Sequence, residues 1–431
     1  MMRQTLVIAA LMSALPAIAA NANLSSIYQT ARDQDAEFAA ARESYKAGQE
    51  KVPQGRAGLL PTVNLGANTR YNDTRSGNAA ASDFNSSSIS ISLTQPIYRK
   101  QNLEAYEQAK VQALFAEQQL KLAEQKLLLS VAQAYFAILQ AQDVLATAQS
   151  QKQAFAEQLA QARKSFEVGA ATITDTHEAQ ARYDLTNAQE IAALNDLEVK
   201  RRALEKIINS ESPELARLTE NVNLTLPEPN NMEAWVKQAE EHSLAVHLNQ
   251  SALELARRDV ERLRGANLPT LDLAASFTDS RNPTSLITSS RSGLLGLEFG
   301  WQLYQGGATD SRVREAVAIQ EKTRFDLDGA RRQSRLDARQ GFLGVLSGDA
   351  QVKALEQALV SSEAQLKSTK LGLEVGVRTR VDVLNAQQQL FTTRRDLAAA
   401  RYQTLLAGLQ LKAAAGVLKE DDLKAVDALL K

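Results

Sequence analysis

Four segments of the chain alternate strictly between apolar and polar residues, near positions 63–71, 89–97, 271–277 and 295–301. Side chains alternate across a β-strand, so each segment predicts a two-faced strand of about ten residues, a length that suits a bilayer crossing. Aromatic residues stand at the strand ends, where the girdle of a membrane barrel would lie: Tyr71, Tyr98, Trp301 and Tyr304. A water-soluble sheet with one face on a core is the alternative that this pattern leaves open.

Between these segments the apolar residues recur every three to seven positions, which predicts helices with narrow apolar stripes. Two long helices are expected over 102–166 and 310–373, the second weakened in its middle by Gly341, Gly344 and Gly348. Shorter helices are expected over 23–54, 174–209, 231–264 and 379–416. If 174–209 stacks end to end on 231–264, and 379–416 on 23–54, the combined length of each short pair matches the length of one long helix. The Pro- and Asn-rich stretch 210–230 and the two termini would then form a collar midway along.

The two halves of the chain are copies of one unit. Glu167-Val168-Gly169 recurs as Glu374-Val375-Gly376, and Asp175 recurs as Asp382, each at an offset of 207 residues. Such self-similarity predicts a tandem duplication of about half the chain.

Composition excludes several classes of protein. The chain has 431 residues with 49 basic and 50 acidic side chains, so it lacks the basic surplus of a nucleic-acid binder. It has no cysteine, which excludes disulfides, thiol chemistry and a lipid-modified N-terminal cysteine. No internal apolar run approaches the roughly 20 residues of a spanning helix, so any membrane crossing is expected to use strands.

The sequence predicts neither an enzyme nor a bound cofactor or metal. The three histidines, His177, His242 and His247, have no ligand spacing and no partner cysteine or acidic cluster. No phosphate-binding glycine loop or nucleophile elbow is present either.

The first 22 residues have the layout of a secretory signal peptide. Arg3 precedes an apolar stretch from Leu6 to Leu15, and Ala20-Asn21-Ala22 is a small-x-small cleavage site. A membrane anchor is the alternative, but the apolar stretch is too short. The mature protein is therefore expected beyond the inner membrane.

Four strands cannot close a membrane barrel alone. They leave two open edges, whose backbone groups would be unsatisfied in lipid. Bacterial barrels begin at about eight strands, so several chains must contribute, and these arguments do not choose between two and three.

Several motifs carry a resemblance to the TolC family of outer-membrane channels, which serve tripartite efflux and type I secretion systems. They are Asn23-Leu24, the Leu-Pro-Thr strand openings at 60–62 and 268–270, Gln95-Pro96-Ile97-Tyr98, Leu303-Tyr304-Gln305-Gly306-Gly307, and the Val-Gly turns that lead to Asp175 and Asp382. The resemblance runs through essentially the whole mature chain. It implies a mainly α fold with a β part: a homotrimer with a 12-stranded transmembrane β-barrel, continued by a 12-helix α-barrel with a small equatorial domain.

The expected organisation follows the duplication. A signal peptide (1–22) is followed by a periplasmic helix (23–59), a barrel β-hairpin (60–99), a long helical hairpin (100–208) and an equatorial segment (209–232). The second copy has a periplasmic helix (233–267), a barrel β-hairpin (268–304), a long helical hairpin (305–418) and a C-terminal equatorial segment (419–431).

The turns at the ends of the long helices are the candidate site. Gly169 and Gly376 are placed to end these helices in the left-handed conformation. Thr172 and Thr379 each stand three residues before an aspartate, which is the spacing of a capping box.

The resemblance assigns roles to residues of these turns. It implies that Asp382 and Asn385 line a periplasmic constriction, that Arg378 and Asp175 latch it, and that Val168, Gly169, Val375 and Gly376 dock an adaptor. Three Asp382 carboxylates at one axis would raise one another's pKa and attract cations, although a neutral Asn385 ring weakens any cation block.

The resemblance also implies the partners and the location. They are a periplasmic adaptor (membrane fusion) protein, an inner-membrane RND or ABC transporter, and the lipid of the cell outer membrane, with the protein extending into the periplasm and binding no nucleic acid. The expected function is the outer-membrane exit duct of an efflux pump or type I secretion system, which opens at its helix tips. A soluble periplasmic coiled-coil scaffold or adaptor is the alternative, and a passive porin is disfavoured because over half the chain is helical.

Overall fold

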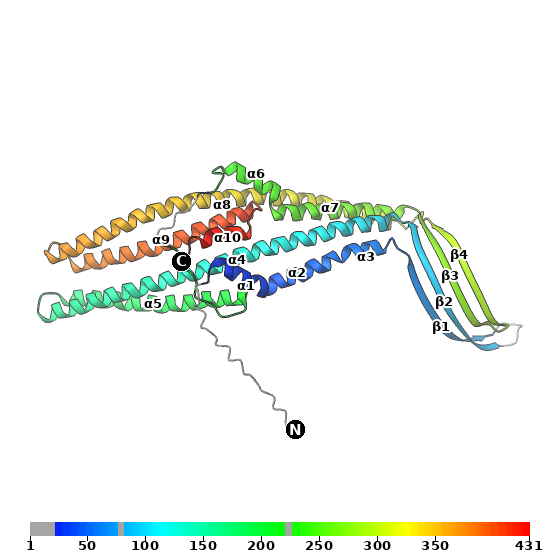
Figure 1. The fold of residues 1–431 in the computed structure, drawn as a ribbon, viewed down its shortest axis with the longest axis horizontal. Helices are drawn as coiled ribbons and strands as arrows, with labels where there is room; N and C mark the ends of the chain where they lie inside the picture. Colours follow the sequence, from blue (N-terminus) through cyan, green and yellow to red (C-terminus); the bar gives the residue numbers. More distant parts are fainter. Residues whose placement is uncertain (1–21, 76–81, 220–225) are drawn as a thin grey trace, which may run out of the picture.

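The computed structural model describes residues 22–75, 82–219 and 226–431, and the predicted signal peptide lies outside them except for Ala22. A layer of long helices runs along most of the molecule and ends in a single β-sheet (Figure 1). The chain crosses from helices to sheet and back twice, once in each half.

The sheet has four antiparallel strands in the order β1-β2-β3-β4. Their bounds are β1 Thr62–Thr74, β2 Ser82–Tyr98, β3 Thr270–Thr284 and β4 Ile287–Gly300. The four predicted strands are confirmed, but with 13 to 17 residues they are longer than expected. Polar residues beyond the apolar alternation continue the pairing, as Asp73 does with Asp83.

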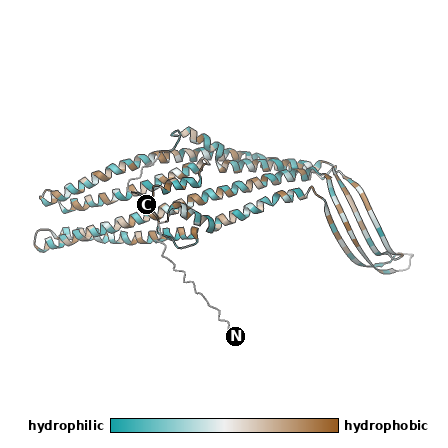
Figure 2. Cartoon of the chain, in the orientation of Figure 1, coloured by the Kyte–Doolittle hydropathy of each residue, from teal (hydrophilic) through white to brown (hydrophobic). Residues whose placement is uncertain are grey.

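The register sorts the sheet into one apolar and one polar face. Leu65 lies opposite Ile91, which lies opposite Phe277, whereas the neighbouring row joins Asn64, Ser92 and Ser276. The apolar row is exposed in the single chain, with Leu65 74% and Phe277 52% accessible. Figure 2 shows this alternation of hydropathy along the strands.

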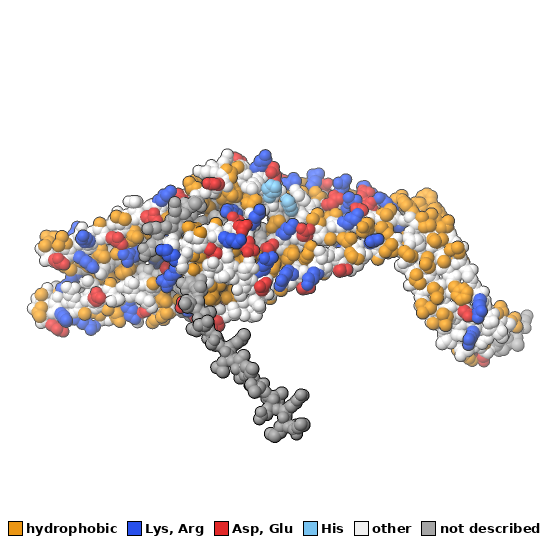
Figure 3. All heavy atoms as spheres, in the orientation of Figure 1, with side chains coloured by type: hydrophobic (Ala, Val, Ile, Leu, Met, Phe, Trp, Pro, Cys, Tyr) orange, Lys and Arg blue, Asp and Glu red, His pale blue; other side chains and the backbone are white. Residues whose placement is uncertain are grey.

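Charged residues gather at the end of the sheet that is remote from the helices (Figure 3). Two ion pairs lie there, Arg75 with Asp73 and Arg291 with Asp279, each at 3.4 Å. The sheet therefore has an apolar band, followed by charged residues at the end remote from the helices. This arrangement is typical of strands that extend beyond the hydrocarbon layer of a bilayer.

The two long helices are α4 Lys100–Glu167 and α8 Ala308–Glu374, and both were predicted to within a few residues. The glycines do not interrupt α8, which is continuous, and the expectation that they weaken it stays a prediction. A Cβ at Gly348 would lie 2.4 Å from Thr404 Oγ1, and one at Gly341 would lie 3.0 Å from Leu411 Cα. These glycines allow close packing of α8 against α9 Arg380–Ala414.

The shorter helices are more broken than expected. The predicted helix 23–54 is divided into α1 Leu24–Gln34, α2 Ala36–Gln49 and α3 Lys51–Ala57, and 231–264 is divided into α6 Met232–His242 and α7 Leu244–Arg264. Asp35 makes the first break, since its side chain accepts a 2.7 Å hydrogen bond from the Phe38 N–H and caps α2. The remaining elements are α5 Ile173–Ile208, α10 Glu420–Asp427 and the short 3-10 turn η1 Gly265–Asn267.

The end-to-end stacking expected from the helix lengths was wrong in its pairing. Helices α1 to α3 stack with α5 along α4, where Leu24 shares a core with Leu204 and Ile208. Helices α6 and α7 stack with α9 along α8, where Trp235 packs with Leu411. Each stack lies within one half of the chain, since a short tip joins each long helix to the helix that follows it, and a β-hairpin brings the preceding short helices back beside it.

The main core lies where these stacks meet, midway along the helices. There Ala22 pairs with Leu215, and Leu218 pairs with Leu430, so that both described ends of the chain meet the segment 214–219. The buried Tyr135 hydroxyl donates to the carbonyls of Ala22 at 3.1 Å and Ala216 at 2.8 Å. We call this region the collar (residues 22, 214–219 and 429–431).

Among the described helices, α4 contains a stretch long and apolar enough to cross a membrane, contrary to the sequence expectation. Half of that stretch is buried within the chain. Because α4 packs against helices α1, α2, α3, α5, α7 and α9, its apolar character is explained by its place at the centre of the layer.

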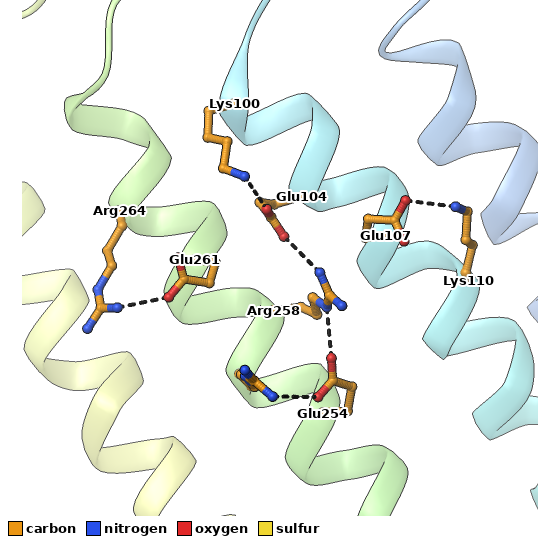
Figure 4. A network of polar contacts seen from close by, with 9 residues as sticks. Lys100, Glu104, Glu107, Lys110, Glu254, Arg258, Glu261 and Arg264 are labelled. Atoms are coloured by element: carbon orange, nitrogen blue, oxygen red, sulfur yellow. Dashed lines mark hydrogen bonds and ion pairs between the residues drawn. The ribbon is translucent and has the colours of Figure 1, made fainter.

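An ion network joins α4 to α7 close to the sheet (Figure 4). Glu104, 7% exposed, accepts a 2.5 Å hydrogen bond from Lys100 and one of 3.4 Å from Arg258. Arg258 also donates to Glu254 at 2.8 Å. These partners, Lys100 first, lower the pKa of the Glu104 carboxyl against the opposing effect of its burial.

Candidate functional site at the helix tips

The first tip joins α4 to α5. Gly169 adopts a φ of +76°, and the Ala170 N–H donates to the Ser165 carbonyl at 2.8 Å, which ends α4. Thr172 and Asp175 then exchange hydrogen bonds of 3.0 and 3.2 Å and begin α5. The predicted glycine cap and capping box are confirmed here.

The second tip repeats this geometry between α8 and α9. Gly376 has a φ of +81°, and Asp382 accepts from the Thr379 N–H at 2.8 Å and from its hydroxyl at 2.9 Å. These bonds, the backbone one first, and the nearby Arg378 lower the pKa of Asp382. Within one chain these contacts favour the ionised form of Asp382, and a rise of its pKa in a three-fold ring stays a prediction.

The Val-Gly turns are exposed. Val168 is 78% and Val375 65% accessible, and a Cβ at Gly169 or Gly376 would meet nothing within 4 Å. Exposed apolar neighbours, which the sequence reasoning did not single out, extend the two patches: Phe166, Ile173, Leu371 and Val377.

The latch between Arg378 and Asp175 that the resemblance implies is not formed within one chain. Among the described residues, no hydrogen bond or ion pair joins Arg378 to Asp175, whose carboxylate serves as a cap. The Arg378 side chain instead lies beside Gly372, where an added Cβ would be 2.7 Å from its Cγ. A contact between neighbouring chains stays a prediction.

Two other arginines connect the tips. Arg182 of α5 donates to the Asn385 side-chain oxygen of α9 at 2.9 Å, and Arg380 of α9 donates to the Ser165 hydroxyl of α4 at 2.6 Å. Sequence reasoning missed both arginines. Arg182 stands seven residues after Asp175, two helical turns along the same face, and this spacing was the available signal.

Two further polar contacts cross from α4 to α9 nearer the collar. Gln151 donates to Gln388 at 2.5 Å, and the Tyr402 hydroxyl donates to Asp143 at 2.7 Å. Tyr402 is 5% exposed. Burial raises the pKa of Asp143 and of Tyr402, and Asp143 raises that of Tyr402 further.

The described residues contain no group of three His, Asp or Glu side chains that could hold a metal ion. His247 contacts the Glu241 carbonyl at 2.8 Å near the end of α6. The polar groups at the tips form helix caps and hydrogen bonds between helices.

Known proteins are similar to this chain over both of its halves. The model of the outer membrane efflux protein family matches residues 27–210 and 235–417, one segment in each half of the duplication. The outer membrane protein TolC of Escherichia coli strain K12 is 34% identical over 424 residues, covering 95% of this chain and 85% of that protein. The alkaline protease secretion protein AprF of Pseudomonas aeruginosa is 31% identical, covering 93% and 86%.

Solved structures share the fold at lower identity. The outer membrane protein VceC from Vibrio cholerae superposes with a TM-score of 0.79 at 17% identity, covering 91% of this chain and 96% of that one. The family match spans most of both halves, and relatives above 30% identity cover nearly the whole chain. The chain therefore belongs to the outer membrane efflux protein family and is an outer-membrane channel protein.

Proposed function

We propose that three copies of this chain form the exit duct of an efflux pump or a type I secretion system, closed at its periplasmic tips until an inner-membrane pump and an adaptor dock. The observation that carries the proposal is a sheet with an exposed apolar face and two open edges, continuous with helices that run away from it.

The sheet supports assembly from several copies. Among the described strands, β1 pairs only with β2, and β4 only with β3, so each outer strand has one free row of backbone donors and acceptors. These rows must pair before the apolar face can enter lipid. Three chains supply 12 strands, enough for a hollow barrel.

The helices support the same assembly. Helix α8 packs against α6, α7 and α9 and leaves a further face uncovered. Along that face exposed apolar residues recur at spacings of 3, 7, 11 or 14 positions: Phe325, Leu336, Leu343, Leu346, Val360 and Leu371. A stripe of this kind needs a partner helix, and α5 of a neighbouring copy offers exposed Leu185 and Ile191.

The tips support gating and docking. In the trimer, Asp382 and Asn385 line the constriction, Arg378 reaches Asp175 of the next chain, and the Val168-Gly169 and Val375-Gly376 turns receive a hairpin of the adaptor. The exposed valines and the open space around both glycines leave room for such a partner.

The soluble scaffold alternative is not supported, because the relatives and the solved structures similar to this chain are outer-membrane channels. The test is the protein purified from outer membranes in detergent. We expect a particle with the mass of three protomers plus a detergent belt, and ion conductance in planar bilayers. A monomer that stays in solution without detergent would overturn the proposal.

A further inference from the structure

Two rows of residues cross the sheet just beyond its apolar band, on the same face as that band. The first row is Ala67, Ile89, Asp279 and Arg291, and the second is Thr69, Ser87, Arg281 and Ser289. Side chains two positions apart along a strand lie on one face, so Arg281 lies on the face of Phe277. The pairing therefore places Arg281 and Arg291 on the face that the proposed duct turns towards lipid.

The height of these rows follows from strand geometry. A strand rises about 3.3 Å per residue, and a tilt of about 40° reduces this to about 2.5 Å along the membrane normal. Arg281 lies ten residues beyond Leu271, which pairs with Tyr98 at the end of the sheet that meets the helices. The height from Leu271 to Arg281 is then about 25 Å, which is the height of the apolar band of a membrane barrel. Arg281 therefore lies at the outer boundary of that band, level with the lipid headgroups.

Positive charge exceeds negative charge where these rows cross β3 and β4, at the charged end of the sheet (Figure 3). Arg291 pairs with Asp279 at 3.4 Å, and their side chains stay 77% and 44% exposed. Arg281 is exposed and has no ion pair with a carboxylate among the described residues. Residues 76–81, which lie outside the described ranges, include no acidic side chain. One carboxylate therefore stands beside two arginines.

The other acidic residues of this face lie farther out, on β1 and β2. Asp73 pairs with Arg75 at 3.4 Å and lies opposite Asp83. Asp83 is four residues beyond Ser87, the strand partner of Arg281, so their backbones are about 13 Å apart. This separation exceeds the Debye length of about 10 Å in 0.1 M salt, so these carboxylates leave Arg281 largely unneutralised.

The second row has the chemistry of a phosphate site. A guanidinium group binds phosphate through two parallel N–H donors. Ser87 and Ser289 flank Arg281 across the strands, and their hydroxyls can donate further hydrogen bonds to phosphate oxygens. Tyr71 lies on the same face, two residues beyond Thr69, where an aromatic side chain suits the boundary between hydrocarbon and water.

We propose that Arg281, with Ser87, Ser289 and Arg291, binds the phosphate-bearing headgroup of an outer-leaflet lipid, whose acyl chains cover the apolar row of Phe277. This inference rests on the proposed duct function, because that function turns the remote end of the sheet towards the cell surface. The partner is a lipid rather than dissolved phosphate, since the arginines lie directly beyond an apolar band that acyl chains must cover.

Lipid binding to the purified trimer tests the proposal. The delipidated protein in dodecyl maltoside is titrated with diphosphoryl lipid A, an acylated sugar with two phosphates, and bound lipid is counted by native mass spectrometry. Arg281→Gln should weaken binding about fivefold, the effect of one arginine at a phosphate-bearing surface. Arg70→Gln is the matched control and should bind like the wild type, because Arg70 pairs with Ser86 at nearly the same height on the opposite, polar face.

Asp279→Asn should change binding in the opposite direction. Loss of this carboxylate frees Arg291 from its ion pair, so the phosphorylated lipid should bind about threefold more tightly. A purely structural role of these residues would not produce tighter binding. The same lipid without its phosphates should bind equally to the wild type and to Arg281→Gln, because only its acyl chains and sugar remain to be bound.

The outcomes separate the lipid site from the duct function. Equal binding of the phosphorylated lipid to the wild type and to Arg281→Gln would overturn the lipid site, and so would equal losses in Arg281→Gln and Arg70→Gln. Unchanged or weaker binding in Asp279→Asn would also overturn it. In each case conducting trimers would leave the duct function intact, whereas a wild-type protein that forms neither trimers nor channels would overturn the duct function itself.

Discussion

The guanidinium of Arg99 holds the Asp272 carboxylate by two hydrogen bonds, 2.8 Å from Nε to Oδ1 and 2.5 Å from Nη2 to Oδ2. Arg99 is the residue before α4, and Asp272 lies near the start of β3, 6% exposed. The pair therefore fixes the first half's long helix to the second half's strand at the junction of the helices and the sheet.

Arg99→Ala should destabilise this junction by about 2–3 kcal/mol, because it leaves a buried carboxylate without its charged donor. The readout is the apparent melting temperature of the assembly in detergent. Arg264→Ala is the matched control, since Arg264 pairs with Glu261 at a half-exposed site and its loss should cost about 0.5 kcal/mol or less. Equal shifts of the melting temperature in both variants would contradict a special role for the pair at the junction.

Low pH should weaken the ionic contact that joins α4 to α7. The folded-state pKa of Glu104 lies below its ordinary value of 4.5, so its contribution to stability is full above that pH and is lost as the pH falls towards the lower folded value. In Glu104→Gln the decline in melting temperature below pH 4.5 should be smaller than in the wild type. If the melting temperature fell equally with pH in the variant and in the wild type, other carboxylates would dominate the loss of stability in acid.

Gly348→Ala should separate α8 from α9, because its Cβ would lie 2.4 Å from Thr404 Oγ1. We expect a net loss of about 1–2 kcal/mol, since overpacking outweighs the helix propensity gained from alanine. Gly329→Ala in the same helix has nothing within 4 Å of the new Cβ and should stabilise the protein by up to about 1 kcal/mol. Urea unfolding in detergent compares the two variants, and equal effects would argue against close packing at Gly348.

The duplicated capping boxes separate a structural role from a functional one. Asp175→Ala and Asp382→Ala each remove the same cap and should speed amide exchange in the first turn of α5 or α9 to a similar degree, equivalent to about 1 kcal/mol. If Asp382 lines the constriction, only its replacement should also change cation sensitivity in planar bilayers. Equal effects on conductance would contradict that assignment.

Replacing the tip glycines tests adaptor docking. Gly376→Ala places a Cβ in open space, so it strains only a φ of +81° and should cost about 1–2 kcal/mol locally. Trimers and conductance should persist while export by the complete system falls. Export at the wild-type level would show that the turn is not a docking surface.

The sequence alone determined the elements of this protein that depend on local chemistry. Alternation placed Leu65 on the apolar face of the first strand and Ile91 on the apolar face of the second, and the offset of 207 paired the two tips. Thr172 with Asp175 and Thr379 with Asp382 became capping boxes, because a cap depends on residues three positions apart.

Only the tertiary structure decided which distant segments meet. Helix lengths were compatible with more than one stacking, and the choice of α1–α3 with α5 follows from connections that keep both beside α4. Arg182 and Asn385 are 203 residues apart, and Arg99 and Asp272 are 173 apart. A side-chain pair of this kind has no sequence period, because it depends on the relative positions of whole helices and strands.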